Sequence, residues 1–223
     1  MKNLEVYYGN NKVLENVNTI FHKNELVLLL GHNGSGKSTL LKAMAGLVNF
    51  SGEINTENNL PHYLLTGYVF QNPETQIIGS TVWEDVIFGL ENLGLKKEEI
   101  KKRAMEILKI TGLLEFKDIE PHNLSGGQKQ KLAISSILVM KPDYLLLDEP
   151  LTMLDKNDRK VIKELIGNLK KIGLGIIIAT HLPEAFLDIS DRVIIMDRGN
   201  IVKDSRKVFE TVRLYINEVE SHD

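Results

Sequence analysis

The chain has 223 residues, with 27 Lys and Arg against 30 Asp and Glu, and a formal net charge of −3 at pH 7. It holds no cysteine, which excludes disulfides and thiolate metal sites, and its slightly acidic balance argues against non-specific nucleic-acid binding, which needs a basic face. The length suits one large domain or a core that carries a subdomain, and the apolar runs are too short for a transmembrane helix.

Four short runs are almost entirely apolar, and polar residues or turns follow them: Leu26–Leu30, Tyr144–Leu147, Ile176–Ala179 and Val193–Met196. Continuous rather than alternating apolar patterns are typical of strands that are covered on both faces. Helical patterns lie between these runs, so we predict a parallel α/β sheet. Such sheets bind ligands at the carboxyl ends of their strands, which is where the polar residues gather.

The segment between the first strand–helix unit and the strand at Tyr144 is much longer than the roughly 30 residues of one βαβ crossover. Residues from about 72 to 140 have mostly helical patterns. Thr81–Glu84 has the capping-box pattern of a helix start, and Ser125 begins a later helix. A helix between them has an apolar stripe at Ile100, Ala104 and Leu108. We therefore predict a helical subdomain inserted in the α/β core.

A glycine-rich segment after the first strand matches the P-loop pattern G-x-x-x-x-G-K-[ST]. It consists of Gly31, His32, Asn33, Gly34, Ser35, Gly36, Lys37, Ser38 and Thr39. The glycines let backbone N–H groups converge on phosphates, and the following helix presents its positive end. Lys37 then supplies an ammonium for the β- and γ-phosphates, and Ser38 a hydroxyl ligand for Mg²⁺. An ordinary glycine-rich turn is the alternative, but the strand before and the helix after favour a phosphate site.

Asp148 and Glu149 end a buried strand, where two adjacent carboxylates are costly unless a cation or a proton needs them. Successive residues of a strand point to opposite sides, so the two acids can do different work. We expect Asp148 to orient Mg²⁺, mostly through its water, and Glu149 to polarise the water that attacks the γ-phosphate. Alone, the pair could be a solvated loop, but beside a P-loop the catalytic interpretation is favoured.

The segment Leu124–Gln128 combines Ser125, at a helix start, with two glycines, Gly126 and Gly127. Unsatisfied N–H groups at a helix start attract anions, and glycine lets a phosphate approach the backbone closely. As an isolated element this segment could equally be an ordinary helix cap. Together with the P-loop it indicates a second anion site.

Taken in order, these motifs resemble those of the ATP-binding cassette (ABC) ATPases over essentially the whole chain. The resemblance implies an α/β fold: a P-loop NTPase (RecA-like) core with a mostly parallel sheet, an antiparallel N-terminal β portion and an inserted helical subdomain. Residues 1–223 would form one ABC ATPase domain. Within it, 1–71 and 141–223 would be the nucleotide-binding core, and 72–140 the helical subdomain that carries the signature Leu124–Gln128.

The same resemblance implies roles that the patterns alone leave open. Tyr8 would stack on adenine, Gln71 would reach Mg²⁺ and the attacking water, and His181 would sense the γ-phosphate. Ser125, Gly126, Gly127 and Gln128 of one subunit would close over the nucleotide held by the P-loop of another, in a head-to-tail dimer with two ATP molecules. The plainer alternatives are a strand-edge aromatic for Tyr8 and a polar strand cap for Gln71.

The segments Val69–Gln76 and Thr81–Gly89 resemble the energy-coupling factor subgroup, whose ATPases power uptake of vitamins or of cobalt and nickel ions. The resemblance implies a peripheral ATPase at the cytoplasmic face of the membrane that binds ATP and Mg²⁺. Its expected partners are a second ABC ATPase subunit, identical or different, a transmembrane coupling protein and a membrane substrate-binding protein, and no nucleic acid. A soluble ABC ATPase acting on DNA or ribosomes is the alternative, but no sustained heptads or basic tract supports it.

The loop after Glu149 departs from the family pattern. The family usually has small or hydroxyl residues where Leu151 and Met153 stand. They lie just before Leu154-Asp155, which resembles the loop that crosses to the partner subunit in the family. Because that loop tunes the partner's site, communication between the two sites is expected to be unusual. The same departure fits a heterodimer of two unlike subunits.

Overall fold

The computed structural model of the chain describes residues 1–220, and the chain divides into two compact units. Unit 1 comprises Met1–Tyr68, Asp143–Glu149 and the chain from Leu169 onward, and unit 2 comprises Val69–Pro142 and Pro150–Asn168. Each unit has a hydrophobic core of its own. The domain boundaries predicted from the sequence stay a prediction.

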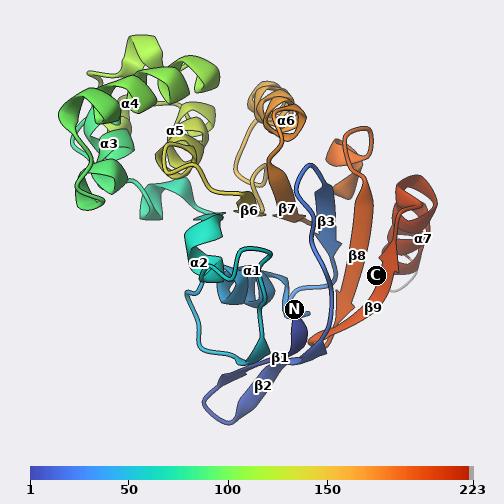
Figure 1. Ribbon diagram of the computed structural model, residues 1–223. Helices are drawn as coiled ribbons and strands as arrows, with labels where there is room; N and C mark the ends of the chain where they lie inside the picture. Colours follow the sequence, from blue (N-terminus) through green and yellow to red (C-terminus); the bar gives the residue numbers. More distant parts are fainter. Residues whose placement is uncertain (221–223) are drawn as a thin grey trace. The chain divides into compact units, whose positions relative to one another are not determined.

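Unit 1 is built on a six-stranded sheet with the strand order β5-β6-β7-β3-β8-β9 (Figure 1). Strands β6, β7, β3 and β8 run parallel to one another, and β9 pairs antiparallel with β8. The prediction of a mostly parallel sheet is therefore confirmed. The bounds are β3 Leu26–Leu30, β5 Thr66–Val69, β6 Tyr144–Asp148, β7 Gly175–Ala179, β8 Arg192–Asp197 and β9 Asn200–Ser205.

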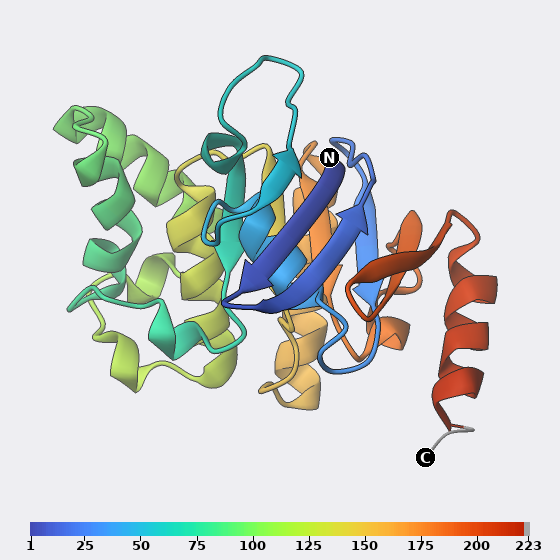
Figure 2. The same ribbon diagram turned by 90° about the horizontal axis from the view of Figure 1, so that it is seen from below.

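A second, antiparallel sheet forms the N-terminal part of unit 1, with the order β2-β1-β4. Its strands are β1 Lys2–Tyr8, β2 Asn11–Val17 and β4 Ser51–Glu53, and Figure 2 shows β1 and β2 side by side. This sheet is the antiparallel N-terminal portion that the family resemblance implied. Helix α1 (Lys37–Met44) contacts β2 as well as β6 and β7, so it packs against both sheets.

The core of unit 1 joins the two sheets through α1. Leu4 and Leu14 come from the antiparallel sheet, Leu40 from α1, and Leu146 and Ile177 from the parallel sheet. All five residues of β3 and all five of β7 are buried, which explains why these strands are continuous apolar runs in the sequence. The remaining elements of unit 1 are α2 (His62–Leu65), the 3₁₀ helix η4 (Pro183–Phe186) and α7 (Val208–Glu220), which packs on β8.

Unit 2 is helical, as the sequence predicted for its region. Helices α3 (Val82–Asn92), α4 (Lys97–Thr111) and α5 (Gly126–Leu138) contact one another around a core that includes the predicted stripe Ile100, Ala104 and Leu108. Three short 3₁₀ helices connect them: η1 Pro73–Thr75, η2 Leu114–Phe116 and η3 Pro121–Asn123. Helix α6 (Lys156–Lys171) belongs to unit 2 as far as Asn168.

The start of α3 differs in one detail from the predicted capping box. The Thr81 hydroxyl accepts a hydrogen bond from the Glu84 N–H at 3.1 Å, as expected. The Glu84 carboxylate, however, accepts from the Ser80 N–H and not from that of Thr81. The helix therefore begins where the pattern indicated, with the reciprocal bond displaced by one residue.

Nowhere in residues 1–220 does a helix combine the length and the apolar character needed to span a bilayer.

The buried parallel strands should dominate the stability of the fold. Leu146 lies in the middle of β6 with no exposed surface, so Leu146→Ala should lower the free energy of unfolding by about 2–5 kcal/mol, through lost apolar burial and the cavity left behind. Leu64 on α2 is 62% exposed, and Leu64→Ala is the matched control, with an expected change of about 0.5 kcal/mol or less. Urea unfolding of both variants measures the difference, and equal losses would contradict the core assignment.

Candidate functional site

The segment that matches the P-loop pattern connects the end of β3 to the start of α1. Gly31 has a φ of 148° and Gly36 a φ of 104°. A Cβ atom on Gly31 would lie 2.3 Å from the Met196 carbonyl oxygen, and a Cβ atom on Gly36 would lie 2.6 Å from the Leu14 side chain. Only glycine fits these two positions, and the tight path they allow brings the loop into the start of α1.

The ammonium of Lys37 folds back over this loop. Its Nζ donates to the carbonyl oxygens of Gly31 at 2.7 Å and His32 at 3.1 Å. Burial lowers the pKa of Lys37, while the carboxylates of Glu149 and Asp148 act in the opposite direction. The loop thus carries a cation close to both predicted acids. Asn33 and Gly34 are exposed in the same loop, and Ser38 and Thr39 are half-buried in the first turn of α1.

Asp148 ends β6 as a buried residue, and one hydroxyl group reaches each of its carboxylate oxygens. Ser38 Oγ donates to Oδ1 at 3.0 Å, and the Tyr68 phenol donates to Oδ2 at 2.8 Å. Burial, and after it the Asp148 carboxylate, raise the pKa of Tyr68 well above its ordinary value, so the phenol remains a hydrogen-bond donor. The structure therefore brings Ser38 and Asp148 together, as the sequence predicted, and adds Tyr68.

Glu149 faces a different partner from Asp148. Its Oε2 lies 2.8 Å from Nδ1 of His181 and accepts a longer bond, at 3.3 Å, from the backbone N–H of the same residue. The N–H of Glu149 donates to the carbonyl of Ala179 at the end of β7, which holds the two strand ends side by side. Glu149 has a φ of 50°, a left-handed conformation that is strained for a residue with a side chain. The two acids thus point toward different groups, as predicted. Glu149, however, lies beyond the end of β6 with a left-handed backbone, so the alternation of an extended strand is not the reason.

These residues fit a nucleotide with its magnesium ion. Within residues 1–220, no group of three or more His, Asp or Glu side chains is arranged to hold a metal by itself. Mg²⁺ usually takes one or two protein groups and completes its shell with phosphate oxygens and water, so Ser38 and Asp148 are a suitable donor set. In the same loop, Ser35 Oγ is buried without a hydrogen-bond partner, which is unusual outside ligand sites.

Tyr8 lies at the end of β1, paired with Asn11 of β2. Its side chain is 48% exposed, so the ring has an open surface for stacking. The strand-edge interpretation describes the same position equally well. Adenine stacking on Tyr8 therefore stays a prediction.

In unit 2, the signature segment forms the start of α5. Ser125 Oγ accepts from the Gln128 N–H at 3.2 Å, and Gln128 Oε1 accepts from the Ser125 N–H at 2.8 Å, which completes a capping box. The helix-cap alternative thus describes a real feature of this segment. An anion that binds at this helix start would have to compete with the two internal hydrogen bonds between Ser125 and Gln128.

Asp158, which no motif in the sequence indicated, also contacts the start of α5. The Gly127 N–H donates to Asp158 Oδ2 at 2.9 Å, and a Cβ atom on Gly127 would lie 2.3 Å from the carboxyl carbon. A carboxylate of this chain therefore occupies a backbone amide of the predicted second anion site. The only sequence signal was that Asp158 is an acid in the first turn of α6. Acids at this position are common because they interact favourably with the dipole of their own helix.

Gln71 is exposed and lies in unit 2, two residues beyond the end of β5. The neighbouring Gln76 anchors this segment: its Oε1 accepts from the Phe70 N–H and its Nε2 donates to the Ala133 carbonyl of α5, both at 3.1 Å. Within unit 2, Gln76 thus links Phe70, the neighbour of Gln71, to the signature helix. The role of Gln71 toward Mg²⁺ and water stays a prediction.

The two residues that depart from the family pattern after Glu149 differ in their exposure to solvent. Leu151 is buried, whereas Met153 is 64% exposed. Asp155 caps α6 by accepting the N–H groups of Asn157 and Asp158, both at 2.9 Å. The unusual Leu151 is therefore part of the packing, and Met153 is the residue that a partner could contact.

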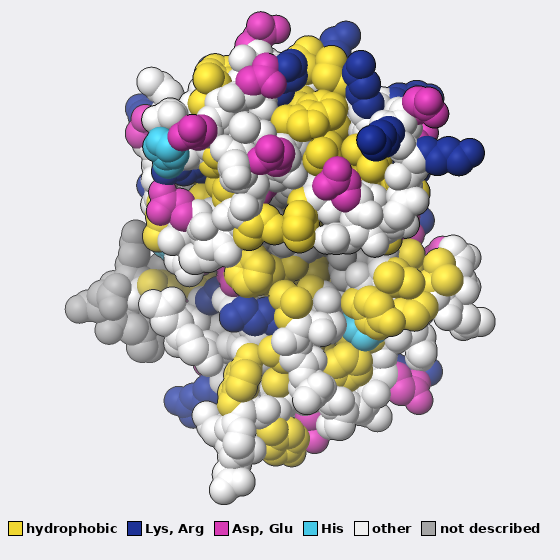
Figure 3. Space-filling model, turned by 90° about the vertical axis from the view of Figure 1, so that its left-hand side faces the viewer, with side chains coloured by type: hydrophobic (Ala, Val, Ile, Leu, Met, Phe, Trp, Pro, Cys, Tyr) yellow, Lys and Arg dark blue, Asp and Glu magenta, His cyan; other side chains and the backbone are white. Residues whose placement is uncertain are grey.

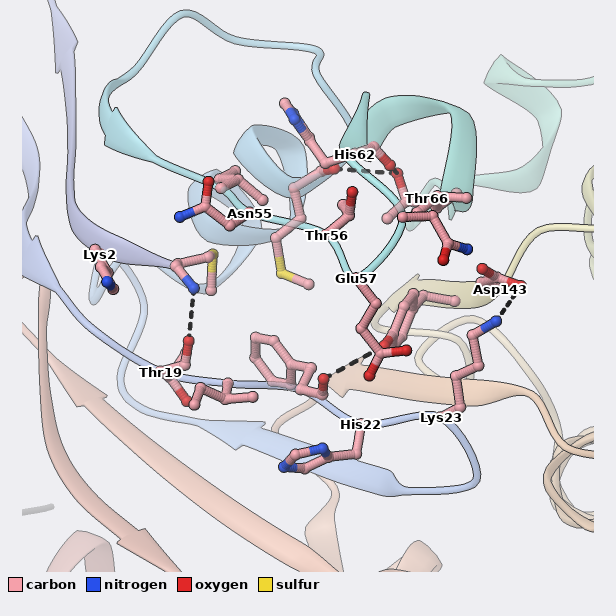
Figure 4. Close-up of a pocket in the computed structure, with 18 of the residues that line it drawn as sticks. Lys2, Thr19, His22, Lys23, Asn55, Thr56, Glu57, His62, Thr66 and Asp143 are labelled. Atoms are coloured by element: carbon pink, nitrogen blue, oxygen red, sulfur yellow. Dashed lines mark hydrogen bonds and ion pairs between the residues drawn. The ribbon is translucent and has the colours of Figure 1, made fainter. Parts of the chain in front are cut away.

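Unit 1 also contains a cavity of about 690 Å³, which lies at the amino ends of the strands, opposite the P-loop (Figure 4). Its lining includes Met1, Phe21, Met44 and Tyr144, and its rim carries the Lys23–Asp143 ion pair at 2.8 Å. Tyr144 begins β6 and Asp148 ends it, so about 13 Å of strand separates the cavity from the acid pair. None of the predicted site residues lines this cavity, and it is separate from the P-loop region.

Comparison with known proteins supports the same family. Residues 14–152 match the ABC transporter family. The energy-coupling factor transporter ATP-binding protein EcfA1 of Caldanaerobacter subterraneus subsp. tengcongensis is 43% identical over 217 residues, which cover 91% of this chain and 77% of the relative. EcfA1 of Thermotoga maritima is 44% identical over 198 residues, covering 87% and 76%.

Solved structures agree with these relatives. The structure of CbiO1 from Clostridium perfringens, described as part of the ABC transporter complex CbiONQ, superposes with a TM-score of 0.82 at 33% identity, covering 98% of this chain and 97% of that one. A nucleotide-free ATP-binding cassette from an ABC transporter gives a TM-score of 0.80 at 25% identity, covering 95% and 92%. The chain therefore belongs to the ABC transporter family, among the ATP-binding proteins of energy-coupling factor transporters.

Proposed function

We propose that this chain is the subunit that binds and hydrolyses ATP to power uptake through a membrane transporter of the energy-coupling factor type. The observation that carries the proposal is the arrangement at the carboxyl ends of β3, β6 and β7. There the P-loop, the Ser38–Asp148 pair and the Glu149–His181 pair lie within one unit, with the two acids directed to different partners. The curated relatives are transporter proteins, so action on DNA or ribosomes has no support.

The proposed mechanism assigns a separate task to each residue. Lys37 and the P-loop amides would hold the phosphates, and Ser38 and Asp148 would hold Mg²⁺. A contribution of Gln71 to that site stays a prediction from the family resemblance. That ion, when bound, neutralises charge that develops on the phosphate oxygens. Glu149 polarises a water molecule and accepts its proton, and the water oxygen attacks the γ-phosphorus while the bond to the ADP oxygen breaks. His181, which contacts Glu149 in this structure, would report the presence of the γ-phosphate.

We infer that the chain works as a dimer with a second ABC ATPase, identical or different, in which Ser125–Gln128 of each subunit covers the nucleotide of the other. We further propose a transmembrane coupling protein and a membrane substrate-binding protein as partners, at the cytoplasmic face of the membrane. On the face shown in Figure 3, hydrophobic side chains form clusters among charged ones. In unit 2, Ile78, Phe88 and Leu93 are exposed, and side chains of this kind suit the helix of a membrane partner. Trp83, Val82, Val86 and Ile87 pack in or against the subunit's own core.

Substitution of the proposed base tests the hydrolysis step. Glu149→Gln should bind ATP but hydrolyse it at least 100-fold more slowly, because an amide cannot accept the proton of the attacking water. The ATP-bound dimer should therefore persist, which size-exclusion chromatography with light scattering and a phosphate-release assay would measure. Glu184→Gln, an exposed acid three residues beyond His181, is the matched control and should behave as wild type.

A third variant separates binding from chemistry. Lys37→Ala should lose nucleotide binding, because the ammonium over the loop is removed. Rapid hydrolysis by Glu149→Gln would remove Glu149 from the role of base. Unchanged ATP affinity in Lys37→Ala would contradict the nucleotide site itself.

The carboxylate of Asp158 predicts a further effect on assembly. It occupies the Gly127 amide, so a phosphate brought by a second subunit would meet a negative charge already in place. In the Glu149→Gln background, Asp158→Asn should lower the ATP concentration needed for half-maximal dimer formation by about threefold. Asp118→Asn changes an exposed acid elsewhere in unit 2 and should leave that concentration unchanged. An unchanged or higher concentration for Asp158→Asn would contradict competition at this amide.

A further inference from the structure

Tyr68 is a buried tyrosine whose hydroxyl reaches the acid of the proposed metal site. It belongs to β5, the neighbour of β6 in the sheet, and is 6% exposed. Its ring packs in the core of unit 1, and its phenol donates to Asp148 Oδ2 at 2.8 Å. A buried tyrosine hydroxyl needs a polar partner, but a backbone carbonyl would satisfy that need equally well. The partner is instead the carboxylate that ends the next strand.

The two hydroxyl groups on Asp148 together determine how its carboxylate is turned. The last torsion of an aspartate is broad, so one hydrogen bond leaves the group free to rock. Here Ser38 holds Oδ1 from α1 and Tyr68 holds Oδ2 from β5, so the carboxylate is fixed from two different elements. We propose that Tyr68 is a positioning residue that orients Asp148 for the Mg²⁺–ATP complex. This inference rests on the proposed function of the site.

The chemistry of a phenol suits this task better than that of a basic side chain. Tyr68 is a neutral donor, so it orients the carboxylate and leaves its negative charge available to a cation; an arginine or lysine would neutralise it. The Ser38 hydroxyl donates a hydrogen bond to Asp148, which leaves the lone pairs of Ser38 Oγ free to bind a metal ion. Each oxygen of Asp148 likewise keeps acceptor capacity beyond the one hydroxyl it receives. The hydrogen bonds therefore orient the metal-binding oxygens of Ser38 and Asp148 and leave both able to bind Mg²⁺.

The test measures how strongly Mg²⁺ promotes nucleotide binding. Binding of the non-hydrolysable analogue adenylyl imidodiphosphate is titrated calorimetrically, once with excess Mg²⁺ and once with EDTA. Tyr68→Phe keeps the ring in the core and removes only the hydroxyl. We expect the gain in affinity on adding Mg²⁺ to shrink by about tenfold in this variant, as is typical when an outer partner of a metal ligand is lost. Affinity in EDTA should stay within about twofold of wild type.

Tyr144→Phe is the matched control. Tyr144 lies at the opposite end of β6, and its hydroxyl donates to the Phe21 carbonyl at 3.3 Å. A purely structural role for tyrosine hydroxyls would lower the thermal unfolding temperature in both variants and leave the Mg²⁺ effect intact in both. Asp148→Asn serves as the positive control, since it removes the charge from the acid itself.

The outcomes separate this inference from the proposed function. If Asp148→Asn loses the Mg²⁺ effect and Tyr68→Phe retains it, Tyr68 is not a positioning residue, and the site assignment stands. If neither variant alters the effect, both the inference and the assignment of Asp148 are overturned. Should Tyr68→Phe not fold, 3-fluorotyrosine at position 68 provides a second measurement by ¹⁹F NMR. Its signal should move when Mg²⁺ is added to the analogue complex, and a signal that stays in place overturns the inference.

Discussion

The site at the carboxyl ends of the parallel strands in unit 1 depends on one buried group, the carboxylate of Asp148 at the end of β6. Removing a carboxylate from water costs several kcal/mol unless other groups replace its hydration. Here α1 supplies the Ser38 hydroxyl, β5 supplies the Tyr68 phenol, and the Lys37 ammonium lies near enough to interact with it. These groups come from two segments, α1 and β5, and Ser38 and Tyr68 lie 110 and 80 residues from Asp148 in the sequence. The same interactions that stabilise Asp148 therefore also assemble the site.

The parallel sheet makes that assembly possible. Leu29 of β3 pairs with Ala179 of β7, and Ala179 pairs in turn with Asp148 of β6, so the three strands end at one level. Whatever follows each strand must then meet the others: the P-loop after β3, Glu149 after β6 and His181 after β7. The antiparallel sheet and α1 share a core with these strands, so the same packing supports the strand ends that carry the site.

Much of this architecture could be predicted from the sequence because its signals are local. Continuous apolar runs indicated the buried strands, and the glycine pattern indicated the P-loop. Tyr68 and Asp158 could not be found in this way, because their partners lie 80 and 31 residues away. A tyrosine in an apolar strand shows that some polar partner exists, but only the pairing of β5 with β6 identifies it. The displaced bond at Ser80 likewise depends on the exact path of the chain.

The backbone of Glu149 shows that catalytic function and folding stability make opposite demands at the end of β6. A left-handed conformation costs about 1–3 kcal/mol in a residue with a side chain, and glycine adopts it without that penalty. Glycine at this position would thus relax the turn after β6 while abolishing the carboxylate beside His181. The polypeptide retains a locally unfavourable shape for the sake of one acidic group, so screening variants for heat resistance alone would select against turnover here.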